Sequence, residues 1–185
     1  DLIGAENIAA GRLAGAGNWG PLNPEYVIAA NPDAIFIAGS SWVGRPAAVL
    51  TGFDADIATT RARLAPYAQR QGWAGLAAIR TGQIFAIEHG LSRALFDYTA
   101  MQFIARQLWP AEFAEIDPEA ELRHYHAQWL PVAFEGCWMA RLTAPVASYV
   151  DDWWGGLGDG RSGSAPQAAP GPVSVLSQVQ LGELE

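Results

Sequence analysis

The 185 residues are about the length of one domain, and half of them are apolar, which is enough to form a core. Eleven basic residues against 19 acidic ones give a formal charge of −8, which disfavours nucleic acid and anionic membranes as partners because they would repel the protein. The single cysteine, Cys137, cannot form an internal disulfide and is predicted to be a small core residue.

A helix and a buried strand are predicted near the start of the chain. Asn23 is a good N-cap, Pro24 suits the first helical position, and Glu25 complements the helix dipole, so a short helix is expected over 24–30. The proline that follows this helix disfavours its continuation. The apolar run 34–38 then predicts a strand that is buried on both faces, as in a parallel sheet.

A loop rich in glycine and serine, 39–53, follows that strand and carries Trp42 and Arg45 near its centre. Residues 54–71 are predicted to be helical with an interruption at Pro66, and 72–79 to form a further short helix.

The second predicted strand covers 84–87 and ends in the loop "EHGLSR", residues 88–93. Apolar residues at helical spacing predict a helix from Asp97 to about Trp109. Asp117 and the proline after it resemble Asn23 and Pro24, and they predict the start of another helix that ends near residue 130. Helices that alternate with buried strands indicate an α/β fold, a Rossmann-like lobe with a mainly parallel sheet flanked by helices.

The composition changes beyond about Thr143. Residues 155–172 are dense in Gly, Pro, Ser and Ala, with too few packing residues to offset the entropy of ordering them. The last stretch, "VSVLSQVQLGELE", is expected to form a short strand or helix only against a partner. The chain is therefore divided into a lobe, 1–142, and a Gly/Pro-rich tail, 143–185, that is expected to be disordered.

Signatures of catalysis and of metal binding are missing from the sequence. It contains no nucleophile elbow, phosphate-binding loop or dinucleotide fingerprint. His124 and His126 are two residues apart, which places them on different faces of their helix and argues against a shared zinc ion. His89 stands beside Glu88 and is by default a solvated loop histidine, although an acid or base in a small α/β metal-dependent hydrolase is an alternative.

Loop aromatic residues are a more positive signal. Trp19 and Trp42 lie in glycine-rich segments where no amphipathic pattern demands a core residue, so each either covers apolar surface or offers a flat contact to a ligand. Arg45 and Arg93 follow the two strands and could bind carboxylates in forked geometry. At the carboxyl ends of strands in an open α/β sheet, such residues indicate a ligand site.

Several phrases follow one another in a characteristic order: "NPEYVIAANPDAIFI", "GWAGLAAIRTGQIFAI", "EHGLSR", "LFDYTAMQFIARQLWPAEFAEIDP" and "HYHAQWLP". Together they resemble the C-terminal lobe of the substrate-binding proteins of ABC importers for metal chelates, the class with a rigid linking helix. That class serves ferric siderophores, haem and vitamin B12, and binds its ligand between two α/β lobes. The resemblance covers residues 1 to about 142.

The resemblance implies that the chain holds only the second lobe. "DLIGAENIAAG" would then follow the linking helix, and the first lobe, that helix and the export signal would be missing from this chain. A half-enclosed ligand is expected to bind weakly to it, if at all.

The resemblance also implies residue roles. Trp19 matches an aromatic residue that faces the ligand in the vitamin B12 binder, and Glu25 matches the glutamate that engages arginines of the permease. Arg93 falls where members of the class often have a ligand-facing arginine. The further ligand-binding candidates rest on loop position only, and they are Trp42, Arg45, His89 and Ser92.

The expected protein is therefore not an enzyme, has no catalytic residue, and needs no cofactor or resident metal. It is expected in the periplasm or another extracytoplasmic space, where it would capture an iron-siderophore or related metal chelate and deliver it to the permease. Vitamin B12, haem and a molybdate-type oxyanion remain alternative ligands, because half of the pocket would come from the other lobe.

Overall fold

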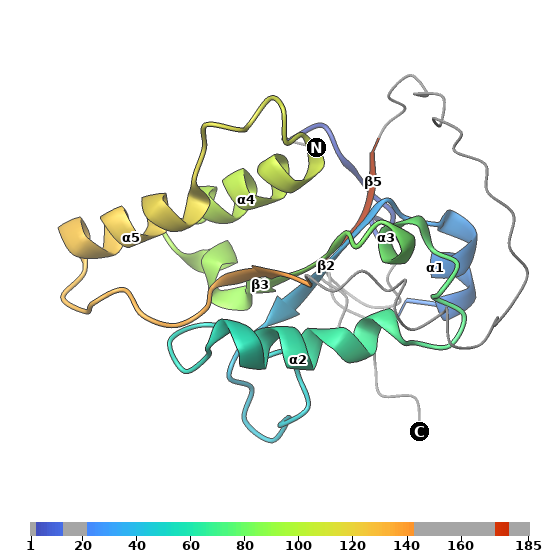
Figure 1. Ribbon diagram of the computed structural model, residues 1–185, viewed down its shortest axis with the longest axis horizontal. Coiled ribbons are helices and arrows are strands. Elements are labelled where there is room, and N and C mark those ends of the chain that lie inside the picture. Colours follow the sequence, from blue (N-terminus) through green and yellow to red (C-terminus); the bar gives the residue numbers. More distant parts are fainter. Residues whose placement is uncertain (1–2, 13–21, 143–172, 178–185) are drawn as a thin grey trace, which may run out of the picture.

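The computed structural model describes residues 3–12, 22–142 and 173–177, which form a twisted sheet with helices on both faces (Figure 1). The strand order is β1-β5-β2-β3-β4. The first four of these run parallel, and β4 lies antiparallel to β3. The strands are β1 Glu6–Asn7, β2 Ala34–Gly39, β3 Ile84–Glu88, β4 Met139–Arg141 and β5 Ser174–Ser177. The expected α/β lobe with a mainly parallel sheet is confirmed.

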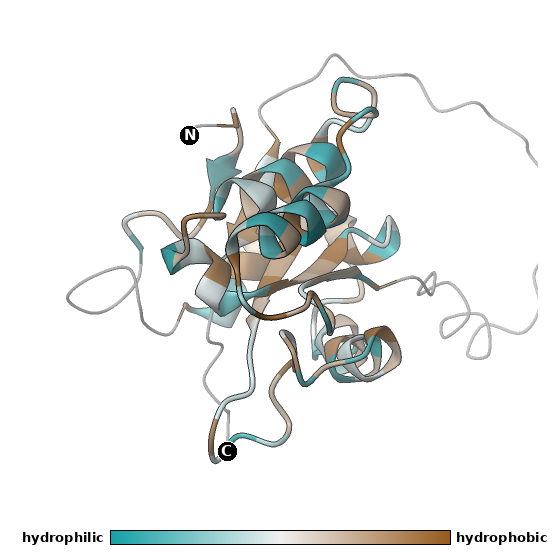
Figure 2. Cartoon of the chain, turned by 90° about the vertical axis from the view of Figure 1, so that its left-hand side faces the viewer, coloured by the Kyte–Doolittle hydropathy of each residue, from teal (hydrophilic) through white to brown (hydrophobic). Residues whose placement is uncertain are grey.

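The helices divide between the two faces because successive side chains of a strand point in opposite directions. Ile35 and Ile37 of β2 face a core cluster that includes side chains of α1, α2 and α3, whereas Phe36 faces α4 on the opposite side. In Figure 2 the strands are mostly brown, and the helices beside them carry teal residues. The helices are α1 Pro24–Ala30, α2 Ile57–Ala68, α3 Ala77–Arg80, α4 Tyr98–Leu108 and α5 Pro118–Trp129.

The predicted helix starts are confirmed at both proline positions. The side chain of Asn23 accepts a hydrogen bond from the amide of Glu25 at 2.8 Å and begins α1. The carboxylate of Asp117 accepts two amides at 3.1 Å and begins α5. None of the helices in the described ranges is long and apolar enough to span a membrane.

Two predictions for the segment 54–80 are corrected. Pro66 does not interrupt the helix but lies within the last turn of α2, where the missing proline amide removes a single helical hydrogen bond. Helix α2 begins after Asp56, whose carboxylate accepts the Thr59 amide at 2.8 Å. The second predicted helix, 72–79, is reduced to the single turn of α3, preceded by turns.

Part of the tail that is expected to be disordered is ordered: Ser174–Ser177 form β5, which lies between β1 and β2 in the sheet (Figure 1). Val175 and Leu176 point to opposite faces and are both buried, and Ser174 donates through its amide and hydroxyl to Asp33 at 2.9 and 3.0 Å. The partner that this short run needs is thus the sheet of its own chain. Residues 143–172 and 178–185 of the predicted tail lie outside the described residues.

Outside the sheet, an isolated backbone β-bridge joins the loop that contains Gly52 to the segment that contains Cys137. Gly52 and Cys137 exchange backbone hydrogen bonds of 2.7 and 3.1 Å. Gly136 makes this approach possible, because it adopts φ +86° and a Cβ there would overlap the carbonyl of Gly52 and lie 2.7 Å from the Cα of Phe53.

An aromatic cluster surrounds a buried histidine next to this bridge. The His126 ring is 1% exposed and lies with its centroid 5.4 to 5.7 Å from those of Phe53, Phe96, Phe134 and Trp138. Neither ring nitrogen makes a hydrogen bond of good geometry within the described residues. The predicted separation of faces holds, since His124 is exposed on the same helix.

Gly136→Ala should destabilise the lobe by roughly 2–4 kcal/mol, because left-handed strain and overpacking add at this position. Gly82→Ala is the matched control: φ is +65° there, but nothing lies within 4 Å of an added Cβ, so only about 1–2 kcal/mol of strain is expected. Urea unfolding of both variants measures the difference. Equal losses would show that the close approach at the bridge has no energetic weight.

Burial lowers the pKa of His126 below its ordinary value of 6.5, an effect that outweighs the opposite influence of the Val132 backbone. The unfolded chain therefore binds a proton at His126 more readily than the folded protein does. The free energy of unfolding is unaffected by this residue well above pH 6.5 and declines as the pH falls below 6.5. Unfolding in urea at pH 8 and pH 5 should show a smaller pH-dependent loss in His126→Phe than in the unchanged protein. His124→Phe should retain the full loss, and a full loss in His126→Phe would contradict the argument.

Candidate ligand-binding site at the carboxyl ends of strands β2 and β3

The register of β2 and β3 places two loops next to each other. The strands pair from Ile35 with Ile84 to Gly39 with Glu88, so both end at the same level of the sheet. The loop after β2 contains Trp42, and the segment after β3 folds into a short 3-10 helix, η1 His89–Arg93. The carboxyl edge of the sheet is where ligands bind in open α/β folds.

Three of the predicted ligand residues form one group, called here the Trp42–His89–Arg93 cluster. The rings of Trp42 and His89 lie 5.1 Å apart between centroids, tilted by 50°. The guanidinium of Arg93 donates to Nε2 of His89 at 2.6 Å, one turn further along η1. Ser92 is adjacent and donates its hydroxyl to the carbonyl oxygen of His89 at 2.9 Å.

This arrangement favours a neutral ring at His89. An Arg93 donor requires an unprotonated Nε2 as acceptor. Burial, and next the positive charge of Arg93, lower the pKa of His89. The positive charge of the cluster is therefore the Arg93 guanidinium. It uses one N–H group to contact the neutral His89 ring, and its other N–H groups remain for a ligand.

Glu88 positions η1 and stands at the centre of the edge. Its carboxylate accepts the Leu91 amide at 3.0 Å, which caps η1, and lies 3.4 Å from the hydroxyl of Ser40. Burial raises the pKa of Glu88, although these hydrogen bonds and the charge of Arg93 act in the opposite direction. The side chain is thus a partly dehydrated carboxylate with acceptor capacity left over.

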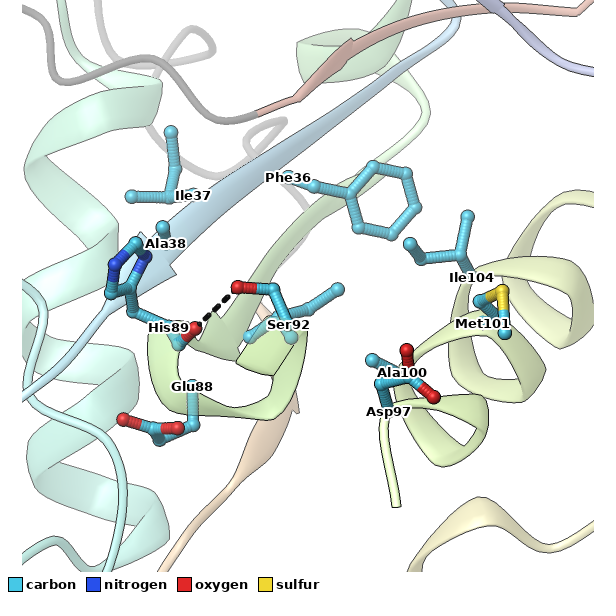
Figure 3. A pocket seen from close by; sticks show the side chains of 11 residues that line it. Phe36, Ile37, Ala38, Glu88, His89, Ser92, Asp97, Ala100, Met101 and Ile104 are labelled. Carbon is cyan, nitrogen blue, oxygen red and sulfur yellow. Dashed lines mark hydrogen bonds between the residues drawn. The ribbon is translucent and has the colours of Figure 1, made fainter. Parts of the chain in front are cut away.

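Two hollows flank Glu88. The first, called the apolar hollow, has a volume of about 260 Å³ and lies between the ends of β2 and β3 and helix α4. Figure 3 shows Phe36 and Ile104 on one side of it and His89 and Glu88 on the other. Most of its lining is apolar, and its polar lining residues are Glu88, His89, Ser92 and Asp97.

The second, called the acidic hollow, has a volume of about 310 Å³ and lies on the other side of Glu88. Two carboxylates line it, Asp54 and Glu88, together with rings of the aromatic cluster. Among the described residues that line it, none is a lysine, arginine or histidine. The lining is completed by Ser40, Ser41, Thr51, Gly52, Phe53, Gly90, Phe96 and Trp138.

The structure brings some of the predicted site residues together and not others. Trp42, His89, Ser92 and Arg93 gather as described, although the first three were predicted from loop position only. Arg45 belongs to the same loop, where its amide donates to the Trp42 carbonyl at 3.2 Å, and it is exposed. Glu25 is exposed in the first turn of α1. Trp19 lies outside the described residues.

Sequence reasoning missed the acidic hollow. Asp54 carries no motif, and Trp138 was not distinguished from a core tryptophan. The one available signal was the density of hydroxyl residues and glycines that follows the first strand, residues 39–52. In the part of the chain that the structure describes, no three His, Cys, Asp or Glu residues are grouped so that they could hold a metal ion.

Comparison with solved structures identifies the fold at this point. The chain superimposes on FepB from Veillonella parvula, a TroA-like periplasmic binding protein, with a TM-score of 0.71 and 34% sequence identity over 77% of the chain. The match spans 40% of the length of that protein. No protein-family model matches the sequence, and no curated protein matches it.

The similarity extends to sequence as well as to fold, and it agrees with the resemblance that the ordered phrases indicate. Over 77% of its length the chain is thus similar in fold and in sequence to a TroA-like periplasmic binding protein.

Proposed function

We propose that the chain is the C-terminal lobe of the substrate-binding component of an ABC importer, and that it captures an iron-siderophore or related metal chelate outside the cytoplasm. The observation that carries this proposal is the Trp42–His89–Arg93 cluster, which stands at the carboxyl edge of the sheet beside the apolar hollow. In the complete protein the first lobe would close over this edge and the ligand would lie between them.

The chemistry of the edge supports a large ligand with an anionic group. Trp42 offers a flat apolar face, and Arg93 offers the remaining donors of a guanidinium to a carboxylate. Arg45, exposed in the same loop, is proposed as a second cation for such a group. His89 and Ser92 hold the cluster in place.

Glu25 is proposed as the contact to the permease. It stands exposed at the first turn of α1, where a carboxylate is stabilised by the helix dipole and remains free to pair with arginines of another protein. Permease docking and chelate capture would then use separate residues.

The rival function, a hydrolase in which His89 and Glu88 act as acid and base, has less support. The Glu88 carboxylate accepts from Leu91 and Ser40, and the Nε2 atom of His89 accepts from Arg93. Both groups thus have positioning contacts that a catalytic pair would have to give up. His89→Ala would abolish turnover in a hydrolase, whereas a binding protein has no turnover to lose.

Calorimetry on this chain should detect little affinity for a ferric chelate, while the two-lobe protein should bind it with a Kd of about 1 µM or tighter. In the two-lobe protein Arg93→Gln should weaken binding about tenfold or more, because a charge-assisted hydrogen bond to the ligand is lost. Arg80→Gln, an exposed arginine of α3, is the matched control and should leave the affinity unchanged. Tight binding by this lobe alone would contradict the shared cleft.

The contact between Arg93 and His89 can be tested by titration. The pKa of His89 should lie below 6.5, and Arg93→Gln should raise it, because the nearby positive charge is removed. An NMR titration of the His89 ring protons in both proteins measures the two values. An unchanged pKa of His89 in Arg93→Gln would show that the two side chains are not in contact in solution.

A further inference from the structure

The acidic hollow differs in chemistry from the rest of the carboxyl edge. The Trp42–His89–Arg93 cluster presents a cation, whereas the acidic hollow presents Asp54 and Glu88 with no basic lining residue. A site with two carboxylates beside aromatic rings attracts a positive group, because carboxylates accept its N–H donors and ring faces attract its charge. Any ligand that spans both parts of the edge would carry both signs of charge.

Glycines leave the Glu88 carboxylate uncovered on the side of this hollow. A Cβ at Gly90 would lie 2.8 Å from Oε2 of Glu88, and a Cβ at Gly52 would lie 3.5 Å from its Cγ. Both glycines line the hollow, and Gly90 is exposed. A side chain at position 90 would therefore cover the Glu88 carboxylate. Because residue 90 is glycine, the carboxylate stays open to a ligand.

The Glu88 carboxylate has acceptor positions to spare. One oxygen accepts the Leu91 amide at 3.0 Å, the other has a long 3.4 Å contact with the Ser40 hydroxyl, and the Gly90 backbone N–H also acts on the carboxylate. A carboxylate can accept about four hydrogen bonds. Arg93 is the nearby cation that acts on Glu88, but its guanidinium donates to His89.

The aromatic lining residues of the hollow offer ring surface to a ligand and no hydrogen-bond donor. Trp138 donates its indole N–H to the carbonyl of Glu135 at 2.8 Å, so its ring and not its donor remains for a ligand. Phe53 is 48% exposed and meets the Trp138 ring edge to face, with centroids 4.9 Å apart. Thr51, 2% exposed, also lines the hollow, and its hydroxyl has no hydrogen-bond partner among the described residues.

We propose that the acidic hollow binds a protonated primary amine, and that the ligand of this protein is accordingly an amphoteric chelate that carries an alkylammonium arm beside its anionic groups. The ammonium group donates to Glu88 and Asp54, and its methylene chain lies along Phe53 and Trp138. The second part of this inference rests on the proposed function, whereas the amine site itself is a property of this lobe.

The amine site is tested on the full 185-residue chain with n-butylammonium chloride as the probe. An NMR titration at constant ionic strength should shift the amides of Gly52 and Gly90 and the indole N–H of Trp138 along one saturable curve, with a Kd in the roughly millimolar range for so small a probe. N-Butylacetamide, which has the same chain but no charge, should give no saturable shift. Saturation by the amide, or no saturation by the amine, would overturn the proposal.

Matched variants distinguish this site from general attraction to a protein of charge −8. Glu88→Gln should weaken amine binding about tenfold or more and keep the η1 cap, since the amide oxygen still accepts. Glu115→Gln removes the same charge from an exposed position outside the hollow and should change nothing. Equal effects of the two would show non-specific attraction and overturn the site.

Gly90→Ala should weaken binding severalfold, because its methyl group displaces the carboxylate of Glu88. Gly75→Ala is the same change at an exposed residue where nothing lies within 4 Å of an added Cβ, and it should bind like the unchanged chain. If Gly90→Ala also binds like the unchanged chain, the uncovered carboxylate is not the site.

The amphoteric ligand is tested with a gallium(III) trihydroxamate that has one free amine and with the same chelate acetylated at that amine. The free-amine chelate should bind to the chain about tenfold more tightly, seen as larger shifts at Gly90 for the same concentration. Equal binding of both would refute the amine arm and leave chelate capture standing. If neither chelate binds to the two-lobe protein while n-butylammonium still binds to this chain, the proposed chelate function fails and the amine site stands.

Discussion

The pairing of β2 with β3 is the constraint on which the rest of the lobe depends. Its hydrogen bonds fix the register from Ile35 opposite Ile84 to Gly39 opposite Glu88, and the side chains of both strands are buried against helices on either face. A slip of one residue would move each side chain of the shifted strand to the opposite face and disrupt its packing against the helices on both sides. Since both strands end together, the loops that follow them are forced into contact, and the candidate site is the result.

Glu88 couples this pairing to the site. It is the last residue of β3, the cap of η1 and a wall of both hollows. Dehydration of a carboxylate is unfavourable, and the Leu91 amide offsets part of that penalty while it sets the direction of η1. The positions of His89 and Arg93 therefore follow from a hydrogen bond made by their neighbour.

The parts of the fold that the sequence predicts are those with local causes. Helices α1 and α5 begin at capping residues followed by proline, and β2 and β3 are short apolar runs bounded by turn residues. Strands β1, β4 and β5 have no such signal, because each is short and is stabilised by hydrogen bonds to strands remote in sequence. Residues 173–177 show this best, since their neighbours Asn7 and Ala34 precede them by more than a hundred residues.

The site divides in the same way. Trp42, His89, Ser92 and Arg93 could be named from the sequence, because position after a parallel strand is a local property that sets a residue at the ligand-binding edge. The acidic hollow could not, since Asp54, Glu88 and Trp138 meet only through the β2–β3 register and the bridge between Gly52 and Cys137. By itself the sequence determined which segments are helix or strand and which edge carries polar loops, because caps, proline and apolar period act within a few residues. Only the tertiary structure decided which polar groups share a hollow and which charges stay unpaired there, because those depend on distances that packing sets between remote segments.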